Sequence, residues 1–155
     1  MKRFRFSLER VLDYRKQMEL DRQRTFARAA EIFRRREENL RGLAKELETY
    51  RTRLAEMGTG RISARELALY RSYLTYLEAR VEEAAAWLED AARDMEARRE
   101  ELVKASKEKK VLDKVKDHKR AEYDYDAARE DTAQLDEVGA TGFIAKSTTA
   151  SGGDA

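Results

Sequence analysis

The sequence predicts an all-α protein: a long antiparallel two-helix coiled-coil hairpin with an overhanging second helix and a disordered C-terminal tail. Three observations lead to this fold. Proline, which breaks helices, is absent, and of the seven glycines only Gly42 lies inside a periodic segment. Charged residues make up 41% of the chain, which is typical of a long helix or coiled coil. Apolar residues also recur every seven positions on both sides of one short glycine-containing segment.

The first helix is predicted over about residues 7–57. Ser7 suits the N-cap position, because its hydroxyl can accept a hydrogen bond from a backbone N–H of the first turn. One heptad line then follows the pattern of a coiled-coil seam, with Glu19 as its polar break. Arg15, Arg22 and Arg36 interrupt the second line, so the seam is expected to be weaker in this half. The first line holds Leu12, Phe26, Phe33, Leu40, Leu47 and Leu54, and the second holds Leu8, Ala29, Leu43, Tyr50 and Met57.

Residues 58–63 are predicted to form the turn, and the second helix is predicted over about residues 64–137. Ser63 and Glu66 have the spacing of a capping box, in which each side chain accepts a hydrogen bond from the other residue's backbone N–H. The heptad then runs without a miss through its first line, and Arg98 is the exception in the second. The lines hold Leu67, Leu74, Val81, Leu88, Met95 and Leu102, and Tyr70, Leu77, Ala84, Ala91, Ala105 and Leu112.

A short turn makes neighbouring helices antiparallel, so residues 1–138 are expected to form one hairpin domain. Phe26 and Phe33 should then face small seam residues such as Ala91 and Ala84. The second helix is the longer one, and residues after about 115 should overhang. Residues 139–155 are rich in Gly, Ser, Thr and Ala, which predicts a flexible tail.

Composition and motifs argue against several classes of function. There is no cysteine, no apolar run approaches the roughly 20 residues needed to cross a bilayer, and the basic start lacks the apolar region of a signal peptide. We therefore expect an unexported, soluble chain. The single histidine, His118, lies between charged neighbours, and no phosphate loop, metal spacing or nucleophile motif is present. These features predict a non-enzyme with no cofactor, metal or small-molecule substrate.

Two surfaces are candidates for binding partners. Leu69, Tyr73 and Tyr76 form an apolar stripe beside the seam, and Tyr50 on the first helix can extend it. The alternative is that these rings simply fold onto the hairpin. The second surface is basic: residues 104–120 hold eight Lys or Arg against three acidic residues, and the hairpin places them beside Lys2, Arg3, Arg5 and Arg10. Such a cluster attracts phosphates, acidic protein or membrane, or is only a solvated face.

The two ends of the chain resemble the flagellar export protein FliJ family. The run Phe4-Arg5-Phe6-Ser7-Leu8-Glu9-Arg10-Val11-Leu12 is similar to that family's opening, and the Lys-rich stretch 107–120 with Glu122-Tyr123 and Gln134–Glu137 is similar to its C-terminal pattern. The resemblance covers about residues 4–138. It implies a cytoplasmic, stalk-like coiled coil at the inner face of the cell membrane at the flagellar base.

The resemblance also implies partners. They are the hexameric flagellar export ATPase, whose assembly and activity the family promotes, the cytoplasmic domain of the membrane export gate, and export chaperones. We assign the basic end to the ATPase and the tyrosine patch, Tyr50, Leu69, Tyr73 and Tyr76, to the gate or another partner. This division is an inference from shape and charge. The basic end comprises Phe4, Phe6, Leu8, Lys109, Lys110, Lys116, Lys119 and Arg120.

Other functions fit parts of the pattern. An adaptor of a virulence-type secretion system, or the central stalk of a rotary ATPase, would share the hairpin, although a rotary stalk normally carries a globular domain where this chain has a tight turn. A structural coiled-coil homodimer is a further alternative. A nucleic-acid binder is disfavoured, because the net charge is only +2 and an acidic run follows residue 121.

Overall fold

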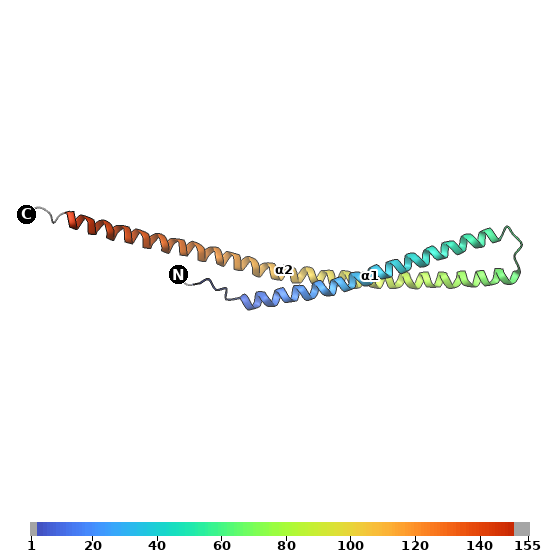
Figure 1. Cartoon of the computed structure of the whole chain (residues 1–155). Coiled ribbons are helices and arrows are strands. Elements are labelled where there is room, and N and C mark those ends of the chain that lie inside the picture. The colour runs from blue at the N-terminus through green and yellow to red at the C-terminus, as the bar shows by residue number, and fades with distance from the viewer. Residues whose placement is uncertain (1–2, 151–155) are drawn as a thin grey trace, which may run out of the picture. The chain divides into compact units, whose positions relative to one another are not determined.

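Two helices make up the fold. The computed structural model describes residues 3–150, and the side chains of residues 3–141, with no strand in the described part. Helix α1 spans Glu9–Met57 and helix α2 spans Ala64–Ala150 (Figure 1). Contacts divide the chain into a hairpin unit, Lys16–Lys107, and a terminal unit formed by the segment up to Arg15 and the segment from Glu108 onward. The predicted all-α hairpin is confirmed.

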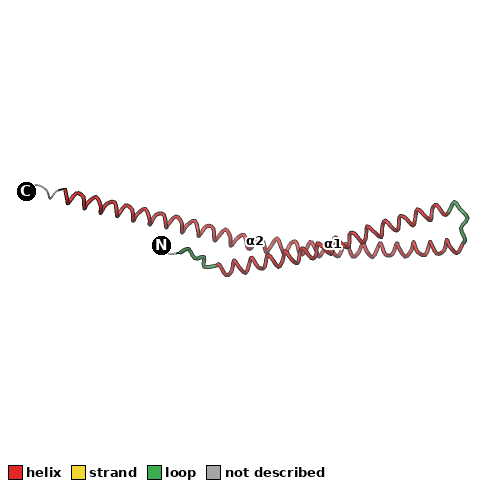
Figure 2. The backbone as a smooth tube through the Cα atoms, viewed as in Figure 1, coloured by secondary structure: helices red, strands yellow, loops and turns green. Residues whose placement is uncertain are grey.

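The hairpin unit holds α1 and α2 side by side in antiparallel order, joined by the turn shown in green in Figure 2. Three cross-helix contacts fix the register: Arg22 with Glu101, Arg36 with the Trp87 ring, and Tyr50 with Tyr73. From one of these contacts to the next, the α1 residue number rises by fourteen and the α2 residue number falls by fourteen. Fourteen residues are two heptads, so the cross-helix contacts follow the seven-residue repeat of the sequence.

A narrow apolar seam forms the core of this unit. Leu47, Leu74 and Leu77 make its buried cluster, and Leu77 is only 1% exposed. Tyr50, Leu54, Tyr73 and Val81 pack against that cluster. No polar side chain is buried among the described residues. The seam positions predicted for the second helix from Leu67 to Leu102 are all buried or half-buried. The stability of the unit thus depends on one apolar stripe per helix.

The register also decides which residues lie level with one another across the seam. Leu47 packs with Leu77, so steps of seven place Leu40 level with Ala84 and Phe33 level with Ala91. The predicted pairs are therefore wrong by one heptad: Phe33 lies level with Ala91 rather than Ala84, and Phe26 lies level with Arg98 rather than Ala91.

The start of α2 agrees with its predicted capping box. The Ser63 backbone N–H donates to Glu66 Oε2 at 3.2 Å, and the Glu66 N–H donates to Ser63 Oγ at 3.2 Å. On the other side of the turn, the Gly60 N–H donates to the Met57 carbonyl at 3.1 Å and ends α1. No described glycine has a positive φ, so this turn uses glycine for its small size and flexibility rather than for a left-handed conformation.

In the terminal unit, α1 begins two residues later than predicted. Ser7 and Leu8 form a turn instead, closed by the Glu9 N–H donating to the Phe6 carbonyl at 3.2 Å. No hydrogen bond of the Ser7 side chain is found in the described part, so it does not cap the helix. The non-helical segment before Glu9 covers more length per residue than a helix, which lets Phe4 reach Tyr123. Pairing therefore extends beyond the predicted limit of about 115.

Helix α2 also continues past its predicted end. It runs to Ala150 rather than Glu137, so residues 139–150 of the expected tail are helical, and residues 151–155 lie outside the described residues. The physical reason is that this stretch contains no proline, and its glycines weaken a helix without ending it. Thr141 even donates its hydroxyl to the Glu137 carbonyl at 2.9 Å, as in a regular helix.

Truncating one leucine of α2 at a time tests the seam. We expect Leu77→Ala to lower the free energy of unfolding by about 2–4 kcal/mol, because it removes a fully buried side chain. Leu69→Ala is the matched control: Leu69 is 64% exposed, and its loss should change stability by less than about 0.5 kcal/mol. Urea unfolding followed by far-UV circular dichroism measures both. Equal losses in the two variants would contradict this seam.

Candidate binding surfaces

The tyrosine patch is a connected cluster of rings in the hairpin unit. The Tyr50 and Tyr73 ring centroids lie 4.6 Å apart, and those of Tyr73 and Tyr76 lie 5.9 Å apart. Tyr70 joins from the seam, 6.1 Å from Tyr50. Such tilted aromatic contacts hold large rings in place at little entropic cost. The structure therefore brings three of the four predicted patch residues together, and Leu69 lies one turn before Tyr73 on α2.

The members of the patch differ in their exposure. Tyr50 and Tyr73 pack against the buried leucine cluster, so part of each ring belongs to the fold. Tyr76 is 56% exposed and Leu69 is 64% exposed. The alternative reading, that the rings fold onto the hairpin, is thus correct for Tyr50 and Tyr73. The accessible part of the patch is Leu69 and Tyr76.

One hydrogen bond fixes the orientation of the central ring. The Tyr73 hydroxyl donates to Glu46 Oε1 on α1 at 2.7 Å. This bond to the carboxylate is the main reason that the pKa of Tyr73 rises from 10.0 to about 12, with partial burial and the Glu46 charge adding to it. Tyr73 is therefore neutral at physiological pH and ties the two helices together across the patch.

Trp87 is a further half-exposed aromatic residue that sequence reasoning missed. It is the only tryptophan, it directly precedes the seam residue Leu88, and it is 38% exposed. The Arg36 guanidinium lies 4.7 Å from its ring centroid, a cation–π distance. Arg36 could have indicated Trp87 from the sequence, since a charged residue at a seam position needs a partner on the facing helix.

All three seam arginines of α1 have such partners on α2. Arg22 Nη1 lies 3.0 Å from Glu101 Oε2, and in the terminal unit Arg15 pairs with Glu108. Glu101 and Glu108 each precede an α2 seam position, as Trp87 does. The side chains of the Arg22 pair are 37% and 40% exposed, so the pair contributes at most about 1 kcal/mol. Each of these pairs joins α1 to α2 and so marks the observed register.

The basic end lies in the terminal unit, and its aromatic members are used internally. The Phe4 ring packs on Tyr123 at 5.6 Å, with the Arg120 guanidinium 5.2 Å from its centroid. Phe6 is only 7% exposed, and Lys116 Nζ lies 6.0 Å from its ring centroid. Phe6 thus belongs to the fold rather than to a free surface. Phe4 is half-buried.

The charged members of the basic end also divide into two groups. Lys116 Nζ pairs with Glu9 Oε1 at 2.8 Å, and Arg120 pairs with Asp124 at 3.2 Å. Lys109 is half-buried. Lys110 and Lys119 are exposed and have no ion pair with any described residue. Leu8, the last member, is 38% exposed, so the members that are exposed and without an ion pair among the described residues are Leu8, Lys110 and Lys119. The two lysines are nine residues apart on α2, so they lie about 180° apart around the helix rather than on one face.

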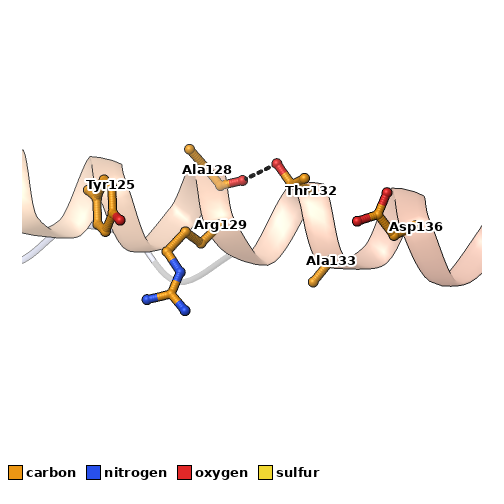
Figure 3. A pocket seen from close by; sticks show the side chains of 6 residues that line it. All are labelled: Tyr125, Ala128, Arg129, Thr132, Ala133 and Asp136. Atoms are coloured by element: carbon orange, nitrogen blue, oxygen red, sulfur yellow. Dashed lines mark hydrogen bonds between the residues drawn. The ribbon is translucent and has the colours of Figure 1, made fainter.

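The remaining described part of α2 holds a shallow surface depression. The depression lined by Tyr125, Ala128, Arg129, Thr132, Ala133 and Asp136 lies on the surface of a single helix (Figure 3). His118 is 76% exposed, with Nε2 3.1 Å from Glu122 Oε1. The described residues hold no His, Cys, Asp or Glu group that could bind a metal ion. Over the same residues, neither helix is long and apolar enough to cross a bilayer.

Fold and surfaces together define a helical-hairpin protein whose candidate sites are exposed surfaces rather than cavities. A family model, the flagellar FliJ protein, matches residues 4–148, and the chain therefore belongs to this family. The chain is thus a coiled-coil protein associated with type III secretion. This confirms the resemblance predicted from its two ends.

The comparisons with individual proteins agree with the fold. The structure is similar to the solved structure of a protein described as a YscO homologue from Chlamydia trachomatis, with a TM-score of 0.54 and 17% sequence identity. The match covers 94% of this chain and 99% of that one. No curated protein shows significant sequence similarity to the chain.

Removing the Glu46 charge tests the central hydrogen bond. We expect Glu46→Gln to lower the pKa of Tyr73 from about 12 toward 10.0, because a neutral amide favours the neutral hydroxyl less than a carboxylate does. Since the folded pKa is raised, the stability from this bond is complete below about pH 10 and is lost as the pH rises through about 12.

Tyrosinate absorbance against pH measures this shift, and Tyr73→Phe identifies the component that belongs to Tyr73. Glu48→Gln is the matched control, because Glu48 is exposed on the same helix and does not bond to Tyr73. Superimposable curves for the two glutamine variants would contradict the assignment.

Proposed function

We propose that this chain is a stalk-like adaptor of the flagellar type III protein export apparatus. It binds the export ATPase and promotes its assembly and activity, and it contacts the cytoplasmic domain of the export gate and the export chaperones. It acts in the cytoplasm, peripherally attached at the inner face of the membrane at the flagellar base, without catalysis or a cofactor. The observation that carries the proposal is membership of the flagellar FliJ family over residues 4–148, both ends of the chain included.

The basic end is the surface we assign to the ATPase. Its aromatic and apolar members order the N-terminal segment on α2, as the Phe4–Tyr123 contact and the burial of Phe6 indicate. Lys110 and Lys119 are left exposed without ion pairs among the described residues, so they are available to carboxylates of a partner. Such unpaired charges steer association and set its rate more than they set its final affinity.

The tyrosine patch is the surface we assign to the gate or to a chaperone. It combines rings that are already fixed in place, Tyr50 and Tyr73, with two accessible apolar side chains, Leu69 and Tyr76. A binding surface that is ordered beforehand loses little conformational entropy when a partner docks. Exposed tyrosines on a rigid helix are frequent anchors of protein interfaces.

The fold likeness to the YscO homologue favours a second candidate, an equivalent adaptor of a virulence-type secretion system. The two candidates differ in the ATPase that they bind. Titrating the chain into purified flagellar and virulence-type export ATPases of its organism, while following ATP hydrolysis and oligomer mass, distinguishes them. Stimulation with ring formation of the flagellar enzyme alone supports the first, and the absence of any effect on either removes the ATPase contact.

Reversing the two free lysines tests the basic end. We expect Lys110→Glu with Lys119→Glu to raise the concentration needed for half-maximal ATPase stimulation roughly tenfold, because attraction becomes repulsion at two exposed positions. The control is Arg28→Glu with Lys45→Glu, which makes the same charge change at exposed positions of the hairpin unit and should have little effect. If both double variants lose stimulation equally, only net charge matters and the assignment fails.

The accessible half of the tyrosine patch gives a second test. Leu69→Ala with Tyr76→Ala should leave helicity and melting temperature nearly unchanged, because both side chains are more than half exposed. The same variant should weaken binding to the purified cytoplasmic domain of the gate, or to an export chaperone, by at least about tenfold. Binding is measured by isothermal titration calorimetry. Unchanged affinity for both partners would contradict the assignment.

A further inference from the structure

The terminal unit carries a second seven-residue repeat on α2 that the hairpin does not use. We call it the outer stripe. It begins two residues after the seam position Lys109, so it lies about 200° around the helix from the seam. This is the face opposite the one that packs on the N-terminal segment. Its members are Val111, His118, Tyr125 and Thr132 on one line, and Lys114, Ala121, Ala128 and Leu135 on the other.

The apolar members of the outer stripe are strongly exposed. Val111 is 61%, Tyr125 is 65% and Leu135 is 72% exposed. Part of the stripe lines the depression in Figure 3, where Tyr125, Ala128 and Thr132 follow one another along a single helix. Exposed apolar side chains at heptad spacing on the outward face of a helix indicate a contact with another helix.

The charges along this part of α2 indicate which helix fits. Residues 104–120 hold eight basic and three acidic residues, and residues 122–137 hold one basic and seven acidic residues. The sign therefore reverses near the middle of the outer stripe. A parallel copy of this helix would place like charges together, whereas an antiparallel copy would place each basic segment beside an acidic one.

We propose that the outer stripe binds the outer stripe of a second copy of this chain in antiparallel orientation. The contact is a symmetric dimer formed through α2 outside the hairpin seam, so the fold of each chain stays as described. It goes beyond the proposed function and does not depend on it.

The heptad fixes one register in which this pairing works. When Tyr125 lies level with Ala121 of the second copy, steps of seven place His118 level with Ala128 and Val111 level with Leu135. In the first two pairs a large ring faces an alanine, and in the third two apolar side chains face each other. Because the dimer is symmetric, each of these contacts occurs twice.

The same register pairs charges that have no ion-pair partner among the described residues of one chain. Lys114 becomes level with Thr132 of the second copy, next to Asp131. This repeats the geometry of the hairpin unit, where Arg22 pairs with Glu101, the residue before seam position Leu102. Lys114 and Asp131 are both exposed.

The second copy is favoured over an unrelated basic helix for a specific reason. A partner helix must carry an acidic segment that faces residues 104–120 and a basic segment that faces residues 122–137. Its apolar residues must also recur every seven positions in register with the outer stripe. The chain itself supplies that pattern. Because the stripe is short and rich in alanine, we expect a weak dimer with a dissociation constant on the order of 10–100 µM.

Charge exchange tests the proposal. Lys114→Asp and Asp131→Lys should each weaken the dimer at least tenfold, because each places like charges together twice in the symmetric contact. The double variant should return the dissociation constant to within roughly threefold of wild type, because it restores the pair with its signs exchanged. Sedimentation velocity of the full chain over a concentration series measures this. Dimerisation should also weaken in high salt.

Leu135→Glu provides the apolar test and should also weaken the dimer, while circular dichroism stays unchanged because Leu135 is exposed. Lys45→Asp, at an exposed position of the hairpin unit, is the matched control and should leave the dimer intact. A wild-type chain that stays monomeric well above 100 µM at low salt overturns the proposal. So does a double variant that fails to recover, because association would then use another surface or another register.

Discussion

Each helix of the hairpin has only one neighbour, and the whole architecture follows from that constraint. A residue can be buried only where the two helices face each other. Apolar residues must therefore recur at the spacing that returns to the same side of a helix, which is about seven residues, or two turns. Leu77 and Ala84, seven residues apart, are almost completely buried, whereas Tyr76 beside them is more than half exposed. With so little interior among the described residues, the candidate sites lie on the surface.

Charged residues occupy several positions along the seam without being buried. Arg22 and Arg36 each have a partner on α2, a carboxylate in one case and an indole ring in the other. Both pairs are partly solvated, so they contribute little stability. They do not fix the register by themselves, because a slip of one heptad would bring Arg22 level with Glu108 and Arg36 level with Asp94. The short connection between α1 and α2 holds the register instead, because such a slip would have to lengthen it by unwinding a helix end.

The fold could be predicted from the sequence because it depends on local signals: the heptads, the absence of proline, and the Ser63–Glu66 capping box, which forms as expected. The prediction was less accurate where tertiary contacts decide. Ser7 was a plausible N-cap, yet the chain turns at Ser7–Leu8 and α1 begins at Glu9. Phe6 and Tyr73 were assigned to binding surfaces by residue type, but each is largely used inside the fold. Trp87 was overlooked because its role depends on Arg36, which is distant in the sequence.

The fixed register in the hairpin unit has a consequence for how such a chain can change its length. Residues that face each other have sequence numbers that rise on α1 and fall on α2 by the same amount. Arg22 faces Glu101, and Arg36, fourteen residues later, faces Trp87, fourteen residues earlier. A single inserted residue in either helix would rotate everything beyond it away from the seam. An insertion that preserves the packing must therefore add a whole heptad to each helix at facing positions. Relatives with hairpins of different length should differ by paired sevens, and single insertions should be confined to the turn and to the part of α2 beyond Tyr123.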